Sequence, residues 1–119
     1  MPDTLQETPQ AGEDWSGRDL SGADLSGLDL SGVSFKAAIL MGANLTGATL
    51  RDACLDETEF AGATLCGADL TGASAIRAGF ARADLSGATL FGANLEGASL
   101  SGANCNSADF RTAILRKAT

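Results

Sequence analysis

The residue types that most often carry chemistry are few and scattered in this sequence. Its 119 residues include no His, so no imidazole can act as a general base or bind a metal ion. Cys54, Cys66 and Cys105 lie far apart without CxxC spacing, which indicates free thiols in a reducing compartment. Serines and threonines are numerous, but no base accompanies them. We therefore expect no catalytic residue, no cofactor and no metal site.

Two recurring features resemble ligand-binding patterns. Gly recurs every five residues, whereas a phosphate-binding loop places its glycines once, between a strand and a helix. A column of Asp24, Asn44, Asp84 and Asn104, interrupted by Thr64, can be imagined as a ladder for cations. The calcium-binding nonapeptide repeat is absent. We therefore favour outward polar residues that hold turns in place.

A five-residue repeat positions these side chains. Every fifth residue from Leu20 to Leu115 belongs to one phase of 20 positions, of which 14 are Leu and four are Phe. The residue two positions earlier is Ala in 16 of the 20 units, and Gly often follows two positions later. In a helix, residues five apart differ by about 140° around the axis, so no apolar face would form. In an extended segment, Ala and Leu two residues apart point to the same side.

Each unit is thus a short extended piece followed by a turn, because Ser-Gly and Thr-Gly pairs favour turns. Successive units that turn the same way wind into a coil with Ala and Leu inside. The units ADLSG (23–27), ANLTG (43–47) and ADLTG (68–72) resemble the pentapeptide-repeat family, whose consensus is A(D/N)LXX. The resemblance covers about residues 18–117. It implies an all-β fold, a right-handed quadrilateral parallel β-helix with four units per coil and about five coils.

The two ends of this solenoid differ in sequence. Residues 1–15 are predicted to form an acidic, flexible tail and cap, and residues 16–119 the β-helix. Trp15 shares the phase of the Leu positions and is expected to plug the N-terminal end. At the other end only four residues follow Leu115. Homodimerisation through the C-terminal coil, a mode known in the family, would cover that end.

Residues that break the pattern are candidate contact sites. Apolar side chains stand at outward positions or in the last coil, and we expect an interface among them: Ile39, Met41, Phe91, Phe110, Ile114 and Leu115. Scattered surface apolar residues are an equally good interpretation of the outward ones. The densest acidic cluster comprises Asp52, Asp56, Glu57 and Glu59.

Charge limits the choice of partner. The chain has 8 basic and 15 acidic residues, net −7, so direct binding of nucleic acid is not expected. Some members of the family mimic duplex DNA and bind DNA gyrase. Residues 16–119 have net charge −3, whereas about 24 Å of duplex DNA would carry about −14. We therefore predict a non-enzymatic structural scaffold for a protein partner, with a DNA-mimicking modulator of a type II topoisomerase as the alternative.

The expected location is the cytoplasm of a bacterium. The first 14 residues, MPDTLQETPQAGED, are polar and acidic and lack the apolar run of an export signal. No membrane-spanning segment is apparent in the sequence, so no contact with a membrane is expected.

Overall fold

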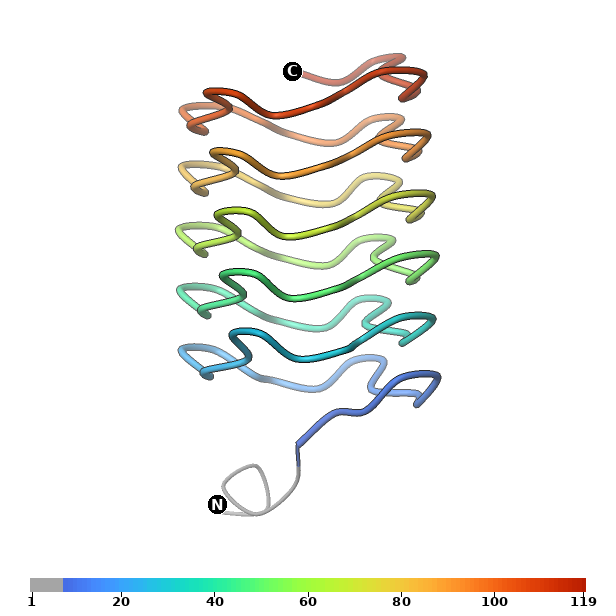
Figure 1. Ribbon diagram of the computed structural model, residues 1–119, viewed down its shortest axis with the longest axis vertical. Coiled ribbons are helices and arrows are strands. Elements are labelled where there is room, and N and C mark those ends of the chain that lie inside the picture. The colour runs from blue at the N-terminus through green and yellow to red at the C-terminus, as the bar shows by residue number, and fades with distance from the viewer. Residues whose placement is uncertain (1–7) are drawn as a thin grey trace.

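The computed structural model describes residues 8–119, which form one continuous solenoid (Figure 1). Every unit contributes a single bridging residue, at every fifth position from Asp14 to Ile114. Each bridge is parallel and joins residues 20 apart, such as Asp24 with Asn44. Four units therefore complete one coil, as predicted, and the fold is a right-handed quadrilateral β-helix. No helix of the described residues is long and apolar enough to cross a membrane.

The solenoid has four sides, which we name by their extended segments. Side A contains residues 18–20 and the segments at 20-residue intervals after them, and sides B and C begin with residues 23–25 and 28–30. Side D contains residues 13–15, 33–35, 53–55, 73–75, 93–95 and 113–115. Bridges thus begin at Asp14, upstream of the predicted start of the β-helix at residue 16. The predicted flexible tail falls partly on residues 1–7, which lie outside the described residues.

Two-residue turns form the corners. At the first A–B corner, the Ala23 amide donates to the Leu20 carbonyl oxygen at 3.0 Å, and Gly22 has φ 71°. A turn in which only the third residue has a positive φ is a type II turn, and Gly is preferred at that third position. The same position has φ between 56° and 77° in every unit from Gly12 to Lys117, including eight residues other than Gly. The coil therefore imposes this conformation even where the sequence does not favour it.

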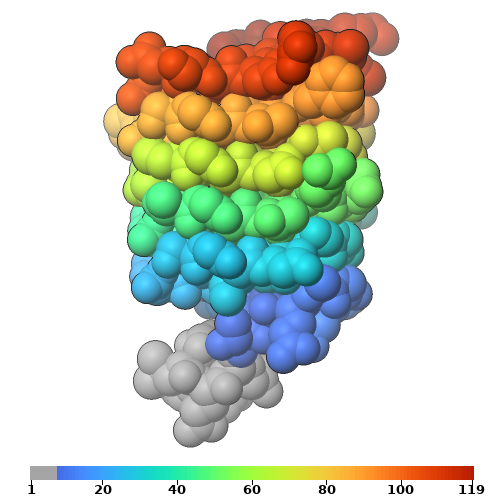
Figure 2. All heavy atoms as spheres, viewed as in Figure 1, coloured from blue at the N-terminus to red at the C-terminus, as the bar shows by residue number. Residues whose placement is uncertain are grey.

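Backbone hydrogen bonds link each coil to the next. The Leu20 and Gly22 amides donate to Ile39 and Met41 oxygens in the following coil, at 2.7 and 2.9 Å. The Ile39 amide donates back to the Arg18 oxygen at 2.9 Å. Each side of a coil thus points two donors and one acceptor toward the C-terminal end. Figure 2 shows the resulting coils stacked directly on one another.

The core is a narrow column of Leu, Phe and Ala. Leu30, Leu45 and Leu70 are fully buried. Phe60 and Phe80, one coil apart, stack with ring centroids 4.9 Å apart and planes 4° from parallel. Thr58 replaces an inward Ala, and its buried hydroxyl donates to the Phe35 carbonyl oxygen at 2.7 Å. The buried polar group thereby keeps a hydrogen-bond partner.

Candidate protein-interaction surface

The C-terminal end of the solenoid leaves its core open. Leu115 and Ile114 are 44% and 43% exposed, and Leu100, Cys105 and Phe110 are only partly buried. In the coil below, Leu85, Leu90 and Leu95 are buried. A contiguous apolar surface of this kind is typical of a protein-binding site.

The last coil also presents unpaired backbone groups. The amides of Cys105, Phe110 and Leu115 occupy positions that donate to the next coil elsewhere, and they have no acceptor within residues 8–119. The carbonyl oxygens of Ala103 and Ala108 likewise receive no backbone donor among the described residues. Open edges of this kind favour pairing with another chain.

The N-terminal end is closed by large side chains. Trp15 is 5% exposed, and its indole Nε1 donates to Glu13 Oε1 at 2.9 Å. The Arg18 guanidinium lies 4.5 Å from the centroid of the Trp15 ring. Arg18 and Leu28 occupy positions that carry Ala in 16 of the 20 units, and Leu28 packs against the core. Trp15 and Leu28 thus pack within the first coil, and the exposed Arg18 lies against the Trp15 ring. Only Trp15 was predicted to close this end.

Phe91 extends the apolar surface from the C-terminal end onto a corner. Its side chain is 42% exposed at the corner between sides C and D, one coil below Arg111. The Arg111 guanidinium lies 5.8 Å from the Phe91 ring centroid and pairs with Asp109 Oδ2 at 2.8 Å. An aromatic ring beside an arginine is the composition enriched in binding hot spots.

The remaining apolar candidates lie elsewhere. Ile39 is 36% exposed on side A, and Met41 is 48% exposed at the A–B corner. Both belong to the second level of the solenoid, far from the last coil, so the six candidates divide between two regions. Phe91, Phe110, Ile114 and Leu115 share the C-terminal end.

The four acidic residues of the predicted cluster are spread over two corners and one side of the solenoid. Asp52 stands at the C–D corner, Asp56 and Glu57 at the D–A corner, and Glu59 on side A. Each of the four side chains contacts the following coil. Asp56 Oδ1 accepts a hydrogen bond from the Ile76 amide at 3.0 Å, and Glu57 forms an ion pair with Arg77 at 3.1 Å. The Asp52 and Glu59 carboxylates lie over Gly72 and Gly79, where a Cβ would meet an oxygen at 2.5 Å.

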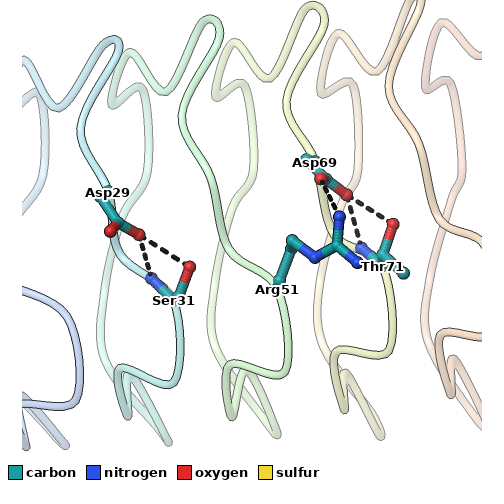
Figure 3. Close-up of polar contacts among 5 residues, drawn as sticks. All are labelled: Asp29, Ser31, Arg51, Asp69 and Thr71. Carbon is teal, nitrogen blue, oxygen red and sulfur yellow. Dashed lines mark hydrogen bonds and ion pairs between the residues drawn. The ribbon is translucent and has the colours of Figure 1, made fainter.

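Outward Asp and Asn residues hold their own corners. Figure 3 shows Asp29 Oδ1 accepting from the amide and hydroxyl of Ser31, at 3.1 and 2.7 Å, and Asp69 bound in the same way to Thr71. Asp69 also pairs with Arg51 across the coil boundary at 3.3 Å. The Ser31 hydroxyl bond, and then its amide bond, lower the pKa of Asp29.

The imagined cation ladder follows this same local chemistry. Asp24 accepts from Ser26 and Asn44 from Thr46, each through the amide and the hydroxyl. Within residues 8–119, no group of three His, Cys, Asp or Glu side chains is arranged to hold a metal ion. The three cysteines are free, and burial raises the pKa of the Cys105 thiol.

Fold and surface together define a four-sided β-helical solenoid with one closed and one open end. A family model for pentapeptide repeats matches residues 19–56, 53–90 and 78–116, with eight copies. The chain therefore belongs to the pentapeptide-repeat family.

Solved structures agree with this assignment. Rfr23, a pentapeptide repeat protein from the cyanobacterium Cyanothece 51142, matches with a TM-score of 0.77 at 25% identity, over 89% of this chain and 90% of that chain. The alr5209 protein from Nostoc PCC 7120 matches with a TM-score of 0.70 at 32% identity, over 82% and 78%. QnrB1, a plasmid-mediated fluoroquinolone resistance protein, matches with a TM-score of 0.50 at 22% identity, over 92% and 71%, which shows the fold alone. Curated proteins gave no match.

Proposed function

We propose that this pentapeptide-repeat protein is a non-enzymatic scaffold that binds another protein through the open C-terminal end of its solenoid. The observation that carries the proposal is the contrast between the two ends. Leu20 in the first coil is 4% exposed, whereas Leu115 in the last is 44% exposed. Covering that end would bury apolar side chains and satisfy backbone donors together.

The first partner to test is a second copy of this chain. The solenoid is 25 × 22 Å across, so an end-to-end contact would bury about 550 Å² per copy, or about 1,100 Å² in total, near the lower limit for a specific interface. Partly buried Phe110 and exposed Leu115 would lie within it.

Substitution of Phe110 tests the proposal. Phe110→Glu places a carboxylate in the open core, and we expect at least a tenfold weaker C-terminal association because the charge would have to be desolvated. Met41→Glu is the control, since Met41 is an exposed apolar residue that lies far from this end. Sedimentation equilibrium over a concentration series measures the mass of each variant. Equal masses for wild type and Phe110→Glu at every concentration, together with equal capture of host proteins, would contradict the proposal.

The cytoplasm is the proposed site of this function, a choice that the three unpaired thiols support. The alternative function, modulation of a type II topoisomerase by DNA mimicry, finds little support in the charges. Arg77, Arg111, Arg116 and Lys117 make the C-terminal half of the solenoid basic rather than DNA-like. A gyrase supercoiling assay with and without a quinolone separates the two functions, because the scaffold should have no effect at micromolar concentration.

A further inference from the structure

The corner between sides D and A carries a stack of charged residues. It consists of residue pairs 16–17, 36–37, 56–57, 76–77, 96–97 and 116–117 at six levels. Backbone hydrogen bonds hold the levels in register. The Ala37 amide donates to the backbone carbonyl oxygen of Asp56 at 3.0 Å, and the Arg77 amide donates to that of Glu96 at 2.8 Å. We call this feature the D–A ridge.

The sign of the charge alternates along the D–A ridge. At the first level the Asp14 carboxylate is hydrogen-bonded to the Ser16 amide at 2.9 Å, so it brings a negative charge to the corner. The five following levels are positive, negative, positive, negative and positive in turn: Lys36; Asp56 and Glu57; Arg77; Glu96; Arg116 and Lys117. By contrast, the turn residues of the B–C corner, from Ser26–Gly27 to Asn106–Ser107, include no charge.

Backbone strain is also concentrated at the D–A ridge. Four of the eight residues other than Gly with positive φ stand here: Ala37 (59°), Glu57 (60°), Arg77 (57°) and Lys117 (61°). A side chain in this region costs about 1 kcal/mol relative to Gly. Three of the four are charged, so this corner carries charge at the expense of coil stability. Strain retained in this way suggests a function.

The charge pattern is complementary to itself after inversion of direction. When two copies lie antiparallel, the first level of one copy faces the sixth level of the other, the second faces the fifth, and the third faces the fourth. Because the sign alternates over six levels, each of these facing levels has opposite charge. Lys36 would then face Glu96 of a second copy, and Asp56 and Glu57 would face Arg77. A two-fold axis between the third and fourth levels, perpendicular to the solenoid axis and parallel to side D, produces this arrangement.

Side D can lie flat against its equivalent in that arrangement. Between its ends, its outward residues are uncharged: Ser34, Cys54, Ser74 and Asn94. Sides A, B and C each carry at least one acidic residue at such middle positions, namely Glu59, Asp84 and Asp69. The same two-fold axis brings Asp14 toward the Ile114 level, beside Arg116 and Lys117. No pair of like charges is therefore forced together on side D.

The area is adequate for a weak specific dimer. Six levels at about 4.8 Å span about 29 Å, and the solenoid is 22–25 Å wide. Side D can therefore bury about 600 Å² per copy, or about 1,200 Å² in total, at the lower end of specific interfaces.

We propose that a second copy of this chain packs antiparallel against side D, with its D–A ridge paired to the D–A ridge of the first. This contact differs from the end-to-end contact proposed above and does not depend on it. It predicts a side-by-side dimer that weakens as salt concentration rises, because its selectivity is electrostatic.

Lys36 and Glu96 provide the decisive charge swap. They are three levels apart in one chain, about 14 Å, and neither has an ion-pair partner among the described residues. Lys36→Glu and Glu96→Lys should each raise the dimer dissociation constant at least about fivefold, because each reverses two intermolecular pairs. The double variant should restore the wild-type constant, since its pairs are again of opposite sign. Such rescue cannot arise within one chain.

Arg82→Glu is the control, because Arg82 is likewise a charged corner residue but stands at the A–B corner, away from side D. Its dissociation constant should equal that of the wild type. Small-angle X-ray scattering gives the shape, and the dimer should be about as long as one solenoid in the Phe110→Glu background, where end-to-end contact is blocked. A double variant as impaired as the single variants, or a Phe110→Glu protein that is monomeric at millimolar concentration and low salt, would overturn the proposal.

Discussion

Each outward Asp or Asn completes the backbone hydrogen bonding of its own corner. In the unit from Ala43 to Gly47, the coils provide partners for the amides of Asn44, Leu45 and Gly47, and the turn provides one for Ala43. The remaining Thr46 amide donates to Asn44 Oδ1 at 3.0 Å. The outward Asp or Asn of each unit thus accepts a hydrogen bond from the one amide for which neither the coils nor the turn provide an acceptor.

Stability should depend on the ionisation of these carboxylates. Bonds from the Ser21, Ser26 and Ser31 hydroxyls, and then from their amides, lower the pKa values of Asp19, Asp24 and Asp29 below the ordinary range. A lowered folded-state pKa gives stability that is complete above the unfolded pKa of about 3.9 and is lost as pH falls through the folded value. The unfolding midpoint in urea should therefore be constant from about pH 6 to 5 and should fall below about pH 4.

A triple variant tests the cause of this pH dependence. Asn44 makes the same two bonds to Thr46 without a titrating group, at 3.0 and 2.6 Å. Asp19→Asn, Asp24→Asn and Asp29→Asn together should therefore reduce the loss of stability between pH 5 and pH 3. An unchanged pH profile in the triple variant would show that other groups cause the acid sensitivity.

At the scale of the five-residue unit, the coil determines the backbone even where the sequence departs from its pattern. Ala37 and Thr112 adopt the left-handed conformation with φ 59° and 56°, although neither favours it. Bonds to both neighbouring coils hold the corner: the Ala37 amide donates to the Asp56 oxygen at 3.0 Å, and the Lys36 oxygen accepts from the Gly17 amide at 2.9 Å. Such positions retain strain that Gly would release.

Ala37→Gly should accordingly stabilise the protein. We expect a gain of about 0.5–1 kcal/mol in the free energy of unfolding, because Gly adopts positive φ at little cost while its greater freedom in the unfolded chain offsets part of the gain. Ala81→Gly is the control: Ala81 is also a corner residue but has no positive φ, so the substitution should destabilise the protein. Urea denaturation measures both. A lower stability for Ala37→Gly would contradict the strain argument.

The sequence predicts this level of organisation well because each five-residue unit repeats the same constraints. The phase of Leu and Ala predicted the inward positions, and the family resemblance predicted four units per coil, as the 20-residue bridges confirm. The contributions of Arg18 and Leu28 at the first coil were missed, because the contact between the exposed Arg18 and the Trp15 ring forms only in the folded coil. The charged residues of the D–A ridge could be assigned to one side from the repeat, but the alternation of their signs was missed, because a net charge for the whole side conceals it.

At the scale of the whole molecule, the solenoid has a polarity that its repeating units conceal. Every coil directs two donors and one acceptor per side toward the C-terminal end. The first coil is closed by Trp15 and Arg18, whereas Leu115 remains exposed in the last coil. A partner at the C-terminal end would therefore meet apolar side chains ringed by backbone donors and by the cations Arg111, Arg116 and Lys117.

Hydrogen–deuterium exchange over a concentration series tests the open end most directly. If a second copy covers it, the amides of Cys105, Phe110 and Leu115 should exchange rapidly in dilute wild-type protein and become at least about tenfold slower at high concentration, with no change in Phe110→Glu. Amides in the first coil, such as Leu20, should exchange equally slowly throughout. Exchange at Cys105, Phe110 and Leu115 that stays rapid in wild-type protein, both at high concentration and after addition of host extract, would contradict a docking surface at the C-terminal end.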